Sequence, residues 1–187
     1  MEPPLDDLAD DRVHAELVEE GDAPENRRGT QREPFAEQPV NRVADQPVFR
    51  LNQAVAGLVD KVQPEVLYVP FLFDLHKDHR EIFHAASVAW RTSSPTGRRI
   101  KAVYCYEVQS ETHWNAPYLE AGFVPNCWVD ITAQLDTKLR ALACYESQIR
   151  PAPDARSIEA VRALAVWRGS QQGMAAAEAF VAIRMLD

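Results

Sequence analysis

The chain has 187 residues, of which 46% are apolar, and carries a formal net charge of −8 at pH 7. This length is typical of one globular domain with a substantial core, and the negative charge argues against nucleic acid as the main partner. No apolar run of about 18 residues occurs, the acidic N-terminus lacks an apolar signal core, and the three cysteines are scattered and odd in number, so we expect a cytoplasmic protein with reduced thiols and no transmembrane segment.

The negative charge is concentrated at the N-terminus. Residues 1–45 contain 13 acidic and 5 basic side chains, whereas the remaining 142 residues contain 15 of each. Phe35 is the only aromatic residue in this first segment. Such a composition buries too little apolar surface to offset the entropy of ordering the chain. We therefore predict a disordered or loosely packed acidic segment over residues 1–46 and a folded domain over residues 47–187.

The first half of this domain reads as a helix, a strand, a second helix and a second strand. Helical spacing of apolar residues, a β-prone apolar run and a polar turn mark these elements. We expect the two strands to be parallel neighbours covered on both faces. In chain order the predictions are a helix over 49–62, a strand over 65–70, a helix over 80–91, a turn over 92–99 and a strand over 101–108.

The second half begins with an irregular aromatic loop over residues 109–125, which we expect to face substrate because it follows the end of a strand. A helix starting at Ser157 should turn Val161, Leu164 and Trp167 inward. The full set is a strand over 127–131, a helix capped by Asp130 or Thr132 and running to 147, a loop over 149–155, the helix from Ser157 to Gly169, a helical piece over 174–180 and an apolar tail over 181–186. The β-α-β-α order predicts an α/β sandwich with a mainly parallel sheet.

Residues able to carry chemistry gather between the first strand and the helix that follows it. Asp74, His76, Asp78 and His79 lie in this loop, and a strand-loop-helix unit builds sites at the carboxyl end of a strand. Neutral imidazole is a good zinc ligand, and an adjacent carboxylate can orient the ring. The pattern suggests a metal-assisted hydrolase site. On these residues alone, the alternative is an ordinary polar loop with Asp78 as a helix cap.

Several other residues have two interpretations. Glu107 either binds substrate or ends its strand in a hydrogen-bonded turn. His113 either touches a sugar or lies on the surface, and Trp114 either stacks on a sugar face or packs in the fold. The remaining candidates are expected to be solvated or helix-surface groups: His14, His84, Arg80 and Arg91.

The loop Asp74-Leu75-His76-Lys77-Asp78-His79-Arg80 resembles the DxHxDH motif of the PIG-L/LmbE family of zinc-dependent de-N-acetylases. The resemblance covers about residues 50–187 in the order of the family's landmarks. Those landmarks are Tyr106-Glu107, Phe123-Val124-Pro125-Asn126 with Val129-Asp130-Ile131, a helix containing Lys138 and ending in Tyr145 and Ser147-Gln148, then Arg156-Ser157, Arg168-Gly169 and Ala177-Glu178-Ala179-Phe180.

The resemblance implies a Rossmann-like three-layer α/β fold and hydrolysis of an N-acetyl amide in a small-molecule N-acetylglucosamine conjugate. It also implies zinc as the cofactor. By position, His79 would be a zinc ligand, His76 the general acid or the stabiliser of the oxyanion, and Asp78 a residue that orients the site. This chemistry is coherent because zinc activates water and polarises a carbonyl, while histidine titrates near neutral pH.

The chain departs from the family at its N-terminus. The AHPDDE-like motif that supplies the family's other zinc ligands and its general base is absent, and Asp10-Asp11-Arg12-Val13-His14 has the residue types in the wrong order. Zinc sites need about three protein ligands, so two more must come from residues 1–48 or from another chain. We expect the N-terminal part of the family fold to be missing, as in a truncated or frame-shifted reading of a longer gene. Two expectations follow: the alternative of a catalytically inactive remnant with weak sugar binding, and homo-oligomerisation through an unpaired strand.

Overall fold

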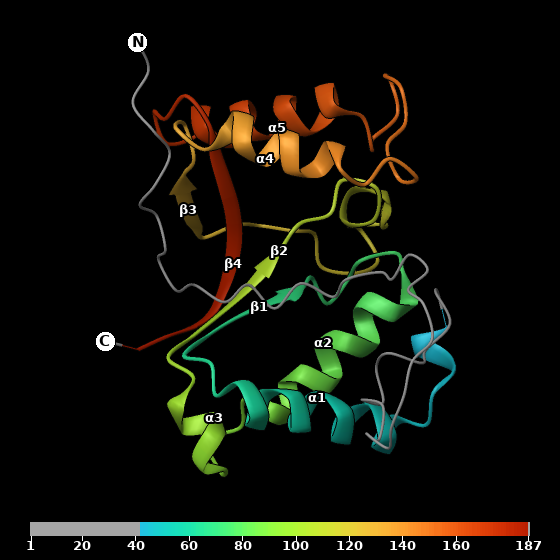
Figure 1. Ribbon diagram of the computed structural model, residues 1–187, viewed down its shortest axis with the longest axis vertical. Helices are drawn as coiled ribbons and strands as arrows, with labels where there is room; N and C mark the ends of the chain where they lie inside the picture. The colour runs from blue at the N-terminus through green and yellow to red at the C-terminus, as the bar shows by residue number, and fades with distance from the viewer. Residues whose placement is uncertain (1–41, 187) are drawn as a thin grey trace, which may run out of the picture. The chain divides into compact units, whose positions relative to one another are not determined.

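The computed structural model describes residues 42–186, which fold as four strands with helices on both sides of the sheet (Figure 1). Most of the acidic segment predicted over residues 1–46, including His14, lies outside the described residues. The elements are η1 (Val43–Asp45), α1 (Val48–Val62), β1 (Val66–Pro70), α2 (Lys77–Ala89), α3 (Pro95–Arg99), β2 (Ala102–Tyr106), η2 (Thr112–Trp114), β3 (Cys127–Asp130), α4 (Leu135–Ala143), α5 (Ile158–Ser170) and β4 (Ala177–Met185). Of the helices in residues 42–186, none has the length and apolar character needed to cross a bilayer.

The strands form one mixed sheet in the order β1-β2-β4-β3. β1 and β2 are parallel, with Val66 opposite Ala102 and Pro70 opposite Tyr106, as predicted for the first two strands. β4 runs antiparallel to β2 and to β3, so parallel pairing is confined to β1 and β2. The α/β class is confirmed, and the architecture is compatible with a Rossmann-like α/β fold. The prediction of a mainly parallel sheet was wrong, because the C-terminal residues form β4, which pairs antiparallel on both sides.

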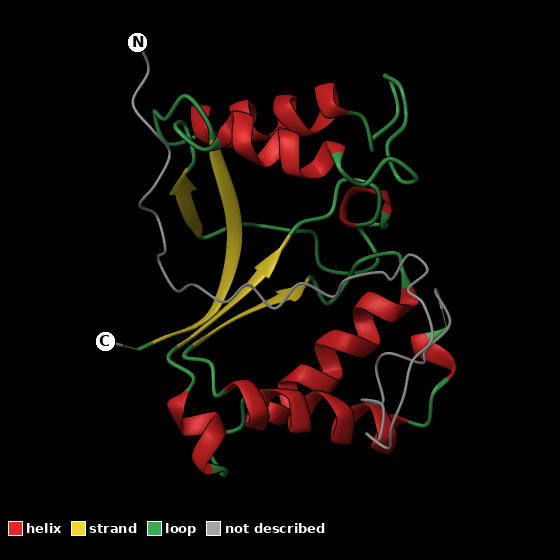
Figure 2. Cartoon of the chain, viewed as in Figure 1, coloured by secondary structure: helices red, strands yellow, loops and turns green. Residues whose placement is uncertain are grey.

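Two apolar clusters hold the helices to the sheet, α1 and α2 below it and α4 and α5 above it in Figure 2. The helix α1 buries Leu51, Val55 and Val59, which recur every fourth residue and therefore lie on one face. They pack with buried residues of β1, α2 and β2, among them Val69 and Val103. The second cluster joins α4 and α5 to the segments flanking β3 and β4 and consists of Ile131, Leu135, Leu139, Ala165 and Ala176.

The C-terminal prediction of a helical piece and an apolar tail was wrong, because residues 177–185 form the strand β4. β4 pairs with β2 along one edge and with β3 along the other, and Phe180 lies opposite both Tyr106 and Cys127. Pairing on both edges satisfies the backbone hydrogen bonds, which outweighs the helix propensity of the alanine-rich sequence.

The helix predicted from Ser157 forms, but the prediction that Trp167 lies on its buried face was wrong. The Ser157 hydroxyl caps α5 by accepting a hydrogen bond from the backbone N–H of Ala160. Val161 packs in the second cluster as expected. Trp167, however, is 51% exposed, whereas Arg168 is 3% exposed. The charged residue turns inward because it has a buried partner, described below.

Candidate active site

The candidate site begins at the carboxyl end of β1, where a short loop leads into α2. His76 is the N-cap of α2, and its Nδ1 accepts a hydrogen bond from the backbone N–H of Asp78 at 3.1 Å. This satisfies one of the donors left without a partner at a helix N-terminus. Because Nδ1 acts as the acceptor, the neutral ring carries its proton on Nε2.

His79, one helical turn later, is held through its other ring nitrogen. Its Nδ1 lies 2.8 Å from Oδ2 of Asp74, a carboxylate with no exposed surface. A carboxylate only accepts hydrogen bonds, so Nδ1 of His79 is the donor and Nε2 carries the lone pair. Thr112 donates from Oγ1 to Oδ1 of Asp74 at 2.6 Å and accepts from the backbone N–H of Val108 at 2.7 Å. Asp74 is therefore fixed on both oxygens, and it fixes His79 in turn.

The structure brings His76 and His79 together. Their rings stack with centroids 5.2 Å apart and an interplanar angle of 28°. The Nε2 of His76 is a hydrogen-bond donor and the Nε2 of His79 is an electron-pair donor. One ring can thus stabilise a developing negative charge beside a second ring that can bind a metal ion or accept a proton.

Asp74 and His79 contact each other, whereas the Asp78 side chain contacts η1. Its Oδ1 accepts a hydrogen bond from the backbone N–H of Ala44 at 2.8 Å, which ties η1 to the start of α2. The carboxylate that orients His79 is Asp74, for which the residue pattern predicted no individual role. One feature could have identified it: an aspartate closing the apolar run Phe71-Leu72-Phe73 is expected to be buried, and buried carboxylates need partners.

Arg80 joins the site loop to the aromatic loop, so its prediction as a helix-surface charge was wrong. Its Nε donates to the backbone carbonyl of Asp74 at 2.6 Å, and its two terminal nitrogens donate to the Glu120 carboxylate at 2.7 Å each. Asn115 adds a second connection by donating to the carbonyl of Phe73 at 2.6 Å. The loop predicted to face substrate is therefore anchored to the site at two points.

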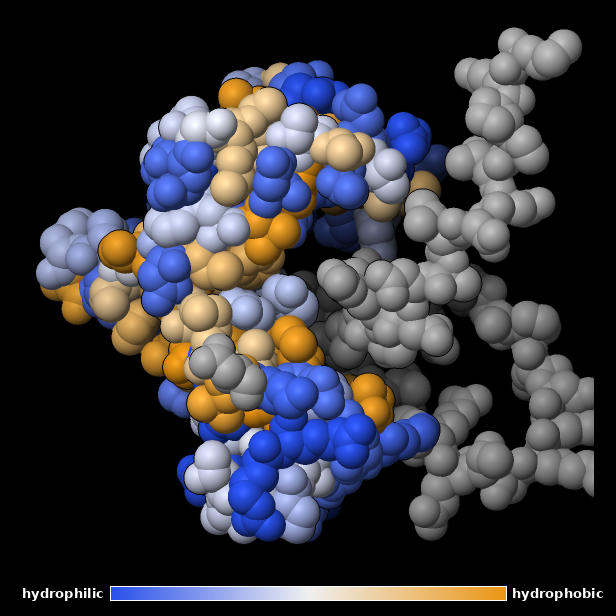
Figure 3. Space-filling view, turned by 90° about the vertical axis from the view of Figure 1, so that its left-hand side faces the viewer, coloured by the Kyte–Doolittle hydropathy of each residue, from blue (hydrophilic) through white to orange (hydrophobic). Residues whose placement is uncertain are grey.

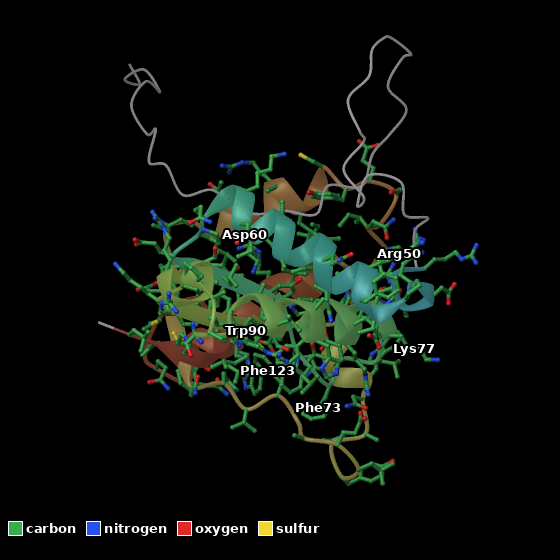
Figure 4. The ribbon with its side chains drawn as sticks, turned by 90° about the horizontal axis from the view of Figure 1, so that it is seen from below. Arg50, Asp60, Phe73, Lys77, Trp90 and Phe123 are labelled. Atoms are coloured by element: carbon green, nitrogen blue, oxygen red, sulfur yellow. The ribbon has the colours of Figure 1, made fainter. Side chains whose placement is uncertain are left out.

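Aromatic side chains line this junction. The ring of Phe71 lies edge-on to Phe73, with centroids 5.7 Å apart, and to Phe123, with centroids 5.2 Å apart. Figure 4 labels Phe73 and Phe123 on the same side of the molecule. Trp114 is 65% exposed. Phe71 and its neighbours thus give the site loop a rigid apolar support, while Trp114 lies open to solvent.

A second polar cluster lies at the end of β2. Glu107 receives hydrogen bonds from Arg168 at 2.7 and 2.6 Å, and its Oε2 lies 2.9 Å from Nε2 of His113. The Glu107 side chain is 6% exposed. Its burial acts to raise the pKa of the carboxyl, but hydrogen bonds and charges from His113 and Arg168 outweigh burial and hold the pKa below its usual value. Glu107 is therefore a buried anion with two cationic or donor partners.

Tyr106 directly precedes Glu107, and the charge of Asp74 affects the pKa of its phenol. Burial and the nearby charge of Asp74 raise the pKa of its phenol to about 12. At neutral pH the hydroxyl is therefore protonated and is a hydrogen-bond donor. Burial raises the pKa of the neighbouring Cys105 thiol to about 12 as well, so this cysteine is an unreactive core residue.

The described residues do not complete a metal site. Within residues 42–186, no three His, Cys, Asp or Glu side chains are placed to hold a metal ion together. The Asp74–His79 pair has the carboxylate–histidine arrangement found behind zinc ligands, but zinc sites in proteins use about three protein ligands. These residues supply one well-oriented ligand and no more.

Comparison with protein-family models gives no match, whereas comparison with solved structures gives several at low sequence identity. The conserved protein TT1542 from Thermus thermophilus is 22% identical over 81% of this chain, with a TM-score of 0.62. An N,N'-diacetylchitobiose deacetylase from Pyrococcus horikoshii, complexed with its inhibitor MPG, is 19% identical over 75%, with a TM-score of 0.55. GalB, the 4-carboxy-2-hydroxymuconate hydratase from Pseudomonas putida KT2440, is 21% identical over 76%, with a TM-score of 0.56.

These similarities establish the fold alone. The chain covers 66%, 54% and 62% of the three proteins in the order given, so it spans between about half and two thirds of their lengths. The deacetylase and the hydratase carry out different reactions, which illustrates that function resides in the site rather than in the fold.

Proposed function

We propose that the chain is a de-N-acetylase-like amide hydrolase acting on an N-acetylated amino-sugar conjugate. The observation that carries this proposal is the pair of stacked imidazoles of opposite hydrogen-bonding character, His76 and His79, at the carboxyl end of β1. The loop resemblance to the PIG-L/LmbE motif and the fold shared with a chitobiose deacetylase support the same reaction class.

The donor on His76 suits the carbonyl of an amide. When water adds to an acetyl carbon, negative charge develops on the carbonyl oxygen, and a preorganised N–H lowers the barrier by binding that charge. The Nε2–H of His76 would make this hydrogen bond, because Nδ1 is occupied by the backbone N–H of Asp78. Asp78 contributes through this backbone group and by holding Ala44 in place.

We propose zinc as the cofactor, with Nε2 of His79 as one ligand. The carboxylate of Asp74 on Nδ1 supports this role, because such a carboxylate fixes the tautomer and raises the basicity of a ligating histidine. Residues 42–186 do not supply the further ligands. Residues 1–41 or a second copy of the chain would have to provide them.

The incomplete ligand set favours a second candidate function, a domain that binds an amino sugar without hydrolysing it. In that case the polar loop, the aromatic loop and Trp114 would form a binding surface, and activity would be absent even with zinc present. The two candidates differ in a measurable quantity, the acetate released from substrate.

The test measures zinc content and acetate release for the full-length chain on N,N'-diacetylchitobiose and on smaller N-acetylglucosamine conjugates. We expect about one zinc per chain and turnover in the native protein. His79→Ala should lose both, whereas His76→Ala should keep the metal and lose about 10²–10⁴-fold in kcat. His84→Ala is the matched control, because His84 lies exposed on α2. No zinc uptake and no acetate release from the native chain would contradict the hydrolase and leave the binding domain.

A further inference from the structure

A second histidine–carboxylate pair is joined to the first through neighbouring residues of the turn η2, Thr112 and His113. Nε2 of His113 is 2.9 Å from Oε2 of Glu107, and the His113 side chain is 40% exposed whereas Glu107 is 6% exposed. The carboxylate is an acceptor only, so Nε2 of His113 carries the hydrogen and Nδ1 carries the lone pair. This hydrogen-bonded form is the one in which an imidazole acts as a base towards water.

Both pairs lie at the same edge of the sheet. β1 and β2 are parallel, so their carboxyl ends meet at one edge, on the right in Figure 1. The turn η2 joins the pairs directly, since Thr112 donates to Asp74 and the next residue, His113, contacts Glu107. The backbone N–H of Leu75 also donates to the carbonyl of Glu111 at 3.2 Å. The second pair therefore belongs to the framework that holds the first.

The cost of burying this cluster needs an explanation. Arg168 and Glu107 are nearly inaccessible, and an ion pair of this kind gains little stability over apolar residues of the same size. The guanidinium of Arg168 is further fixed over the ring of Trp167, at 4.2 Å from its centroid. What the cluster does achieve is a single orientation for the one member that reaches solvent, His113.

We propose that His113 is the general base of the hydrolysis, a role that rests on the function proposed above. Nδ1 of His113 takes a proton from water as the water oxygen bonds to the acetyl carbon and the carbonyl electron pair moves onto oxygen, beside Nε2–H of His76. The imidazolium then returns the proton to the amide nitrogen as the C–N bond breaks and its electron pair goes to nitrogen. The carbonyl re-forms to give acetic acid, whose proton passes to the amine, so the products are acetate and the ammonium group of the sugar.

Charged groups on two other elements surround the His113 ring. Glu107 faces it from the end of β2, with Arg168 behind Glu107 on α5. On its own turn, Glu111 lies 3.8 Å from Arg156. Arg168 balances the charge of Glu107, so the carboxylate that holds the His113 ring is itself held by an ion pair.

The test uses the zinc-loaded full-length chain with three variants. His113→Gln keeps an N–H for Glu107 but has no basic ring nitrogen, and His113→Ala leaves space for a free imidazole; His84→Ala is the control. We expect kcat to fall about 10²–10⁴-fold in both His113 variants, and added imidazole to restore turnover in His113→Ala alone.

The outcomes separate the two proposals. If the native chain turns over substrate and His113→Gln keeps its kcat to within about threefold, the role of His113 is overturned and the hydrolase stands. Reduced turnover in His113→Ala without rescue by imidazole also overturns the role, since that result describes a structural residue. No turnover by the native chain overturns the proposed hydrolase and the general base together.

Discussion

At the scale of single residues, the buried ion pair between Glu107 and Arg168 makes part of the protein's stability depend on pH. The carboxyl has a pKa below its ordinary value of 4.5, because its two partners outweigh the effect of burial. A group whose folded pKa is lowered contributes stability above its unfolded pKa, and that contribution is lost as the pH falls through the folded pKa. This region of the protein should therefore weaken below about pH 4.5.

The variant Glu107→Gln tests this behaviour. At pH 7 it leaves the Arg168 charge buried without a counter-charge, so we expect a loss of about 3–5 kcal/mol in the free energy of unfolding. The gap to the native protein should begin to narrow below about pH 4.5, where the unfolded carboxyl takes up a proton, and should close as the pH falls through the lower pKa of the folded carboxyl. Urea unfolding at pH 7 and pH 4 measures both values.

A matched exchange on the surface provides the reference. Glu65 is 53% exposed and pairs with Lys101 at 3.4 Å, so Glu65→Gln should change stability by less than about 1 kcal/mol at either pH. A constant gap between Glu107→Gln and the native protein across the pH range would show that the ionised carboxyl contributes nothing.

Residue patterns predicted part of the site and missed the rest for a physical reason. His76 and His79 are three positions apart at a helix start, so local geometry alone places them together. Glu107 and Arg168 are 61 positions apart, and Thr112 reaches Asp74 across 38 positions. Such contacts depend on how β2, η2 and α5 pack, which no local spacing encodes.

At the scale of elements, the same distinction separates the helices from the last strand. α1 and β1 were predicted within about two residues, since their apolar periodicity is strong and Pro64 separates them. β4 was not predicted, because its first residues, Ala177-Glu178-Ala179, carry helix formers and only long-range pairing with β2 and β3 makes them a strand.

The packing of α5 against the start of β4 depends on one glycine. A Cβ at Gly169 would lie 2.6 Å from the carbonyl oxygen of Met174 and 2.8 Å from the backbone of Ala176. These are backbone atoms, which cannot rotate away, so Gly169→Ala should push α5 from the sheet and cost about 1–3 kcal/mol.

Gly57 offers a control in which alanine is expected to raise the stability of the protein rather than lower it. It lies within α1, and a Cβ there meets nothing within 4 Å, so Gly57→Ala should stabilise the protein by about 0.5–1 kcal/mol through helix propensity. Thermal unfolding of both variants measures the two shifts. Equal effects of the two substitutions would show that α5 does not approach β4 as closely as the structure indicates.

At the scale of the whole molecule, residues 42–186 combine a hydrogen-bonded polar site with exposed apolar surface on the sheet. The two histidine pairs share one edge of the sheet and their polar atoms are well satisfied, which is typical of a preorganised site. Apolar side chains are nevertheless exposed on the sheet, including Val66 of β1 at 43% and Met185 of β4 at 65%. Figure 3 shows apolar residues gathered across the middle of one face, between more hydrophilic regions.

Association of the chain is the prediction that follows from this surface. Within the part of the chain that the structure describes, β1 pairs with β2 alone and is an edge of the sheet, and an exposed apolar edge strand favours pairing with another chain. We expect light scattering after size exclusion to give a mass that exceeds the 21.1 kDa of one chain and rises with concentration.

Val66→Lys places a charge on this strand and should shift the mass towards one chain. Val48→Lys makes the same exchange at the exposed start of α1, where Val48 is 60% exposed, and should leave association unchanged. A constant mass of one chain at all concentrations would contradict association, and it would also leave residues 1–41 as the only source of the zinc ligands that residues 42–186 lack.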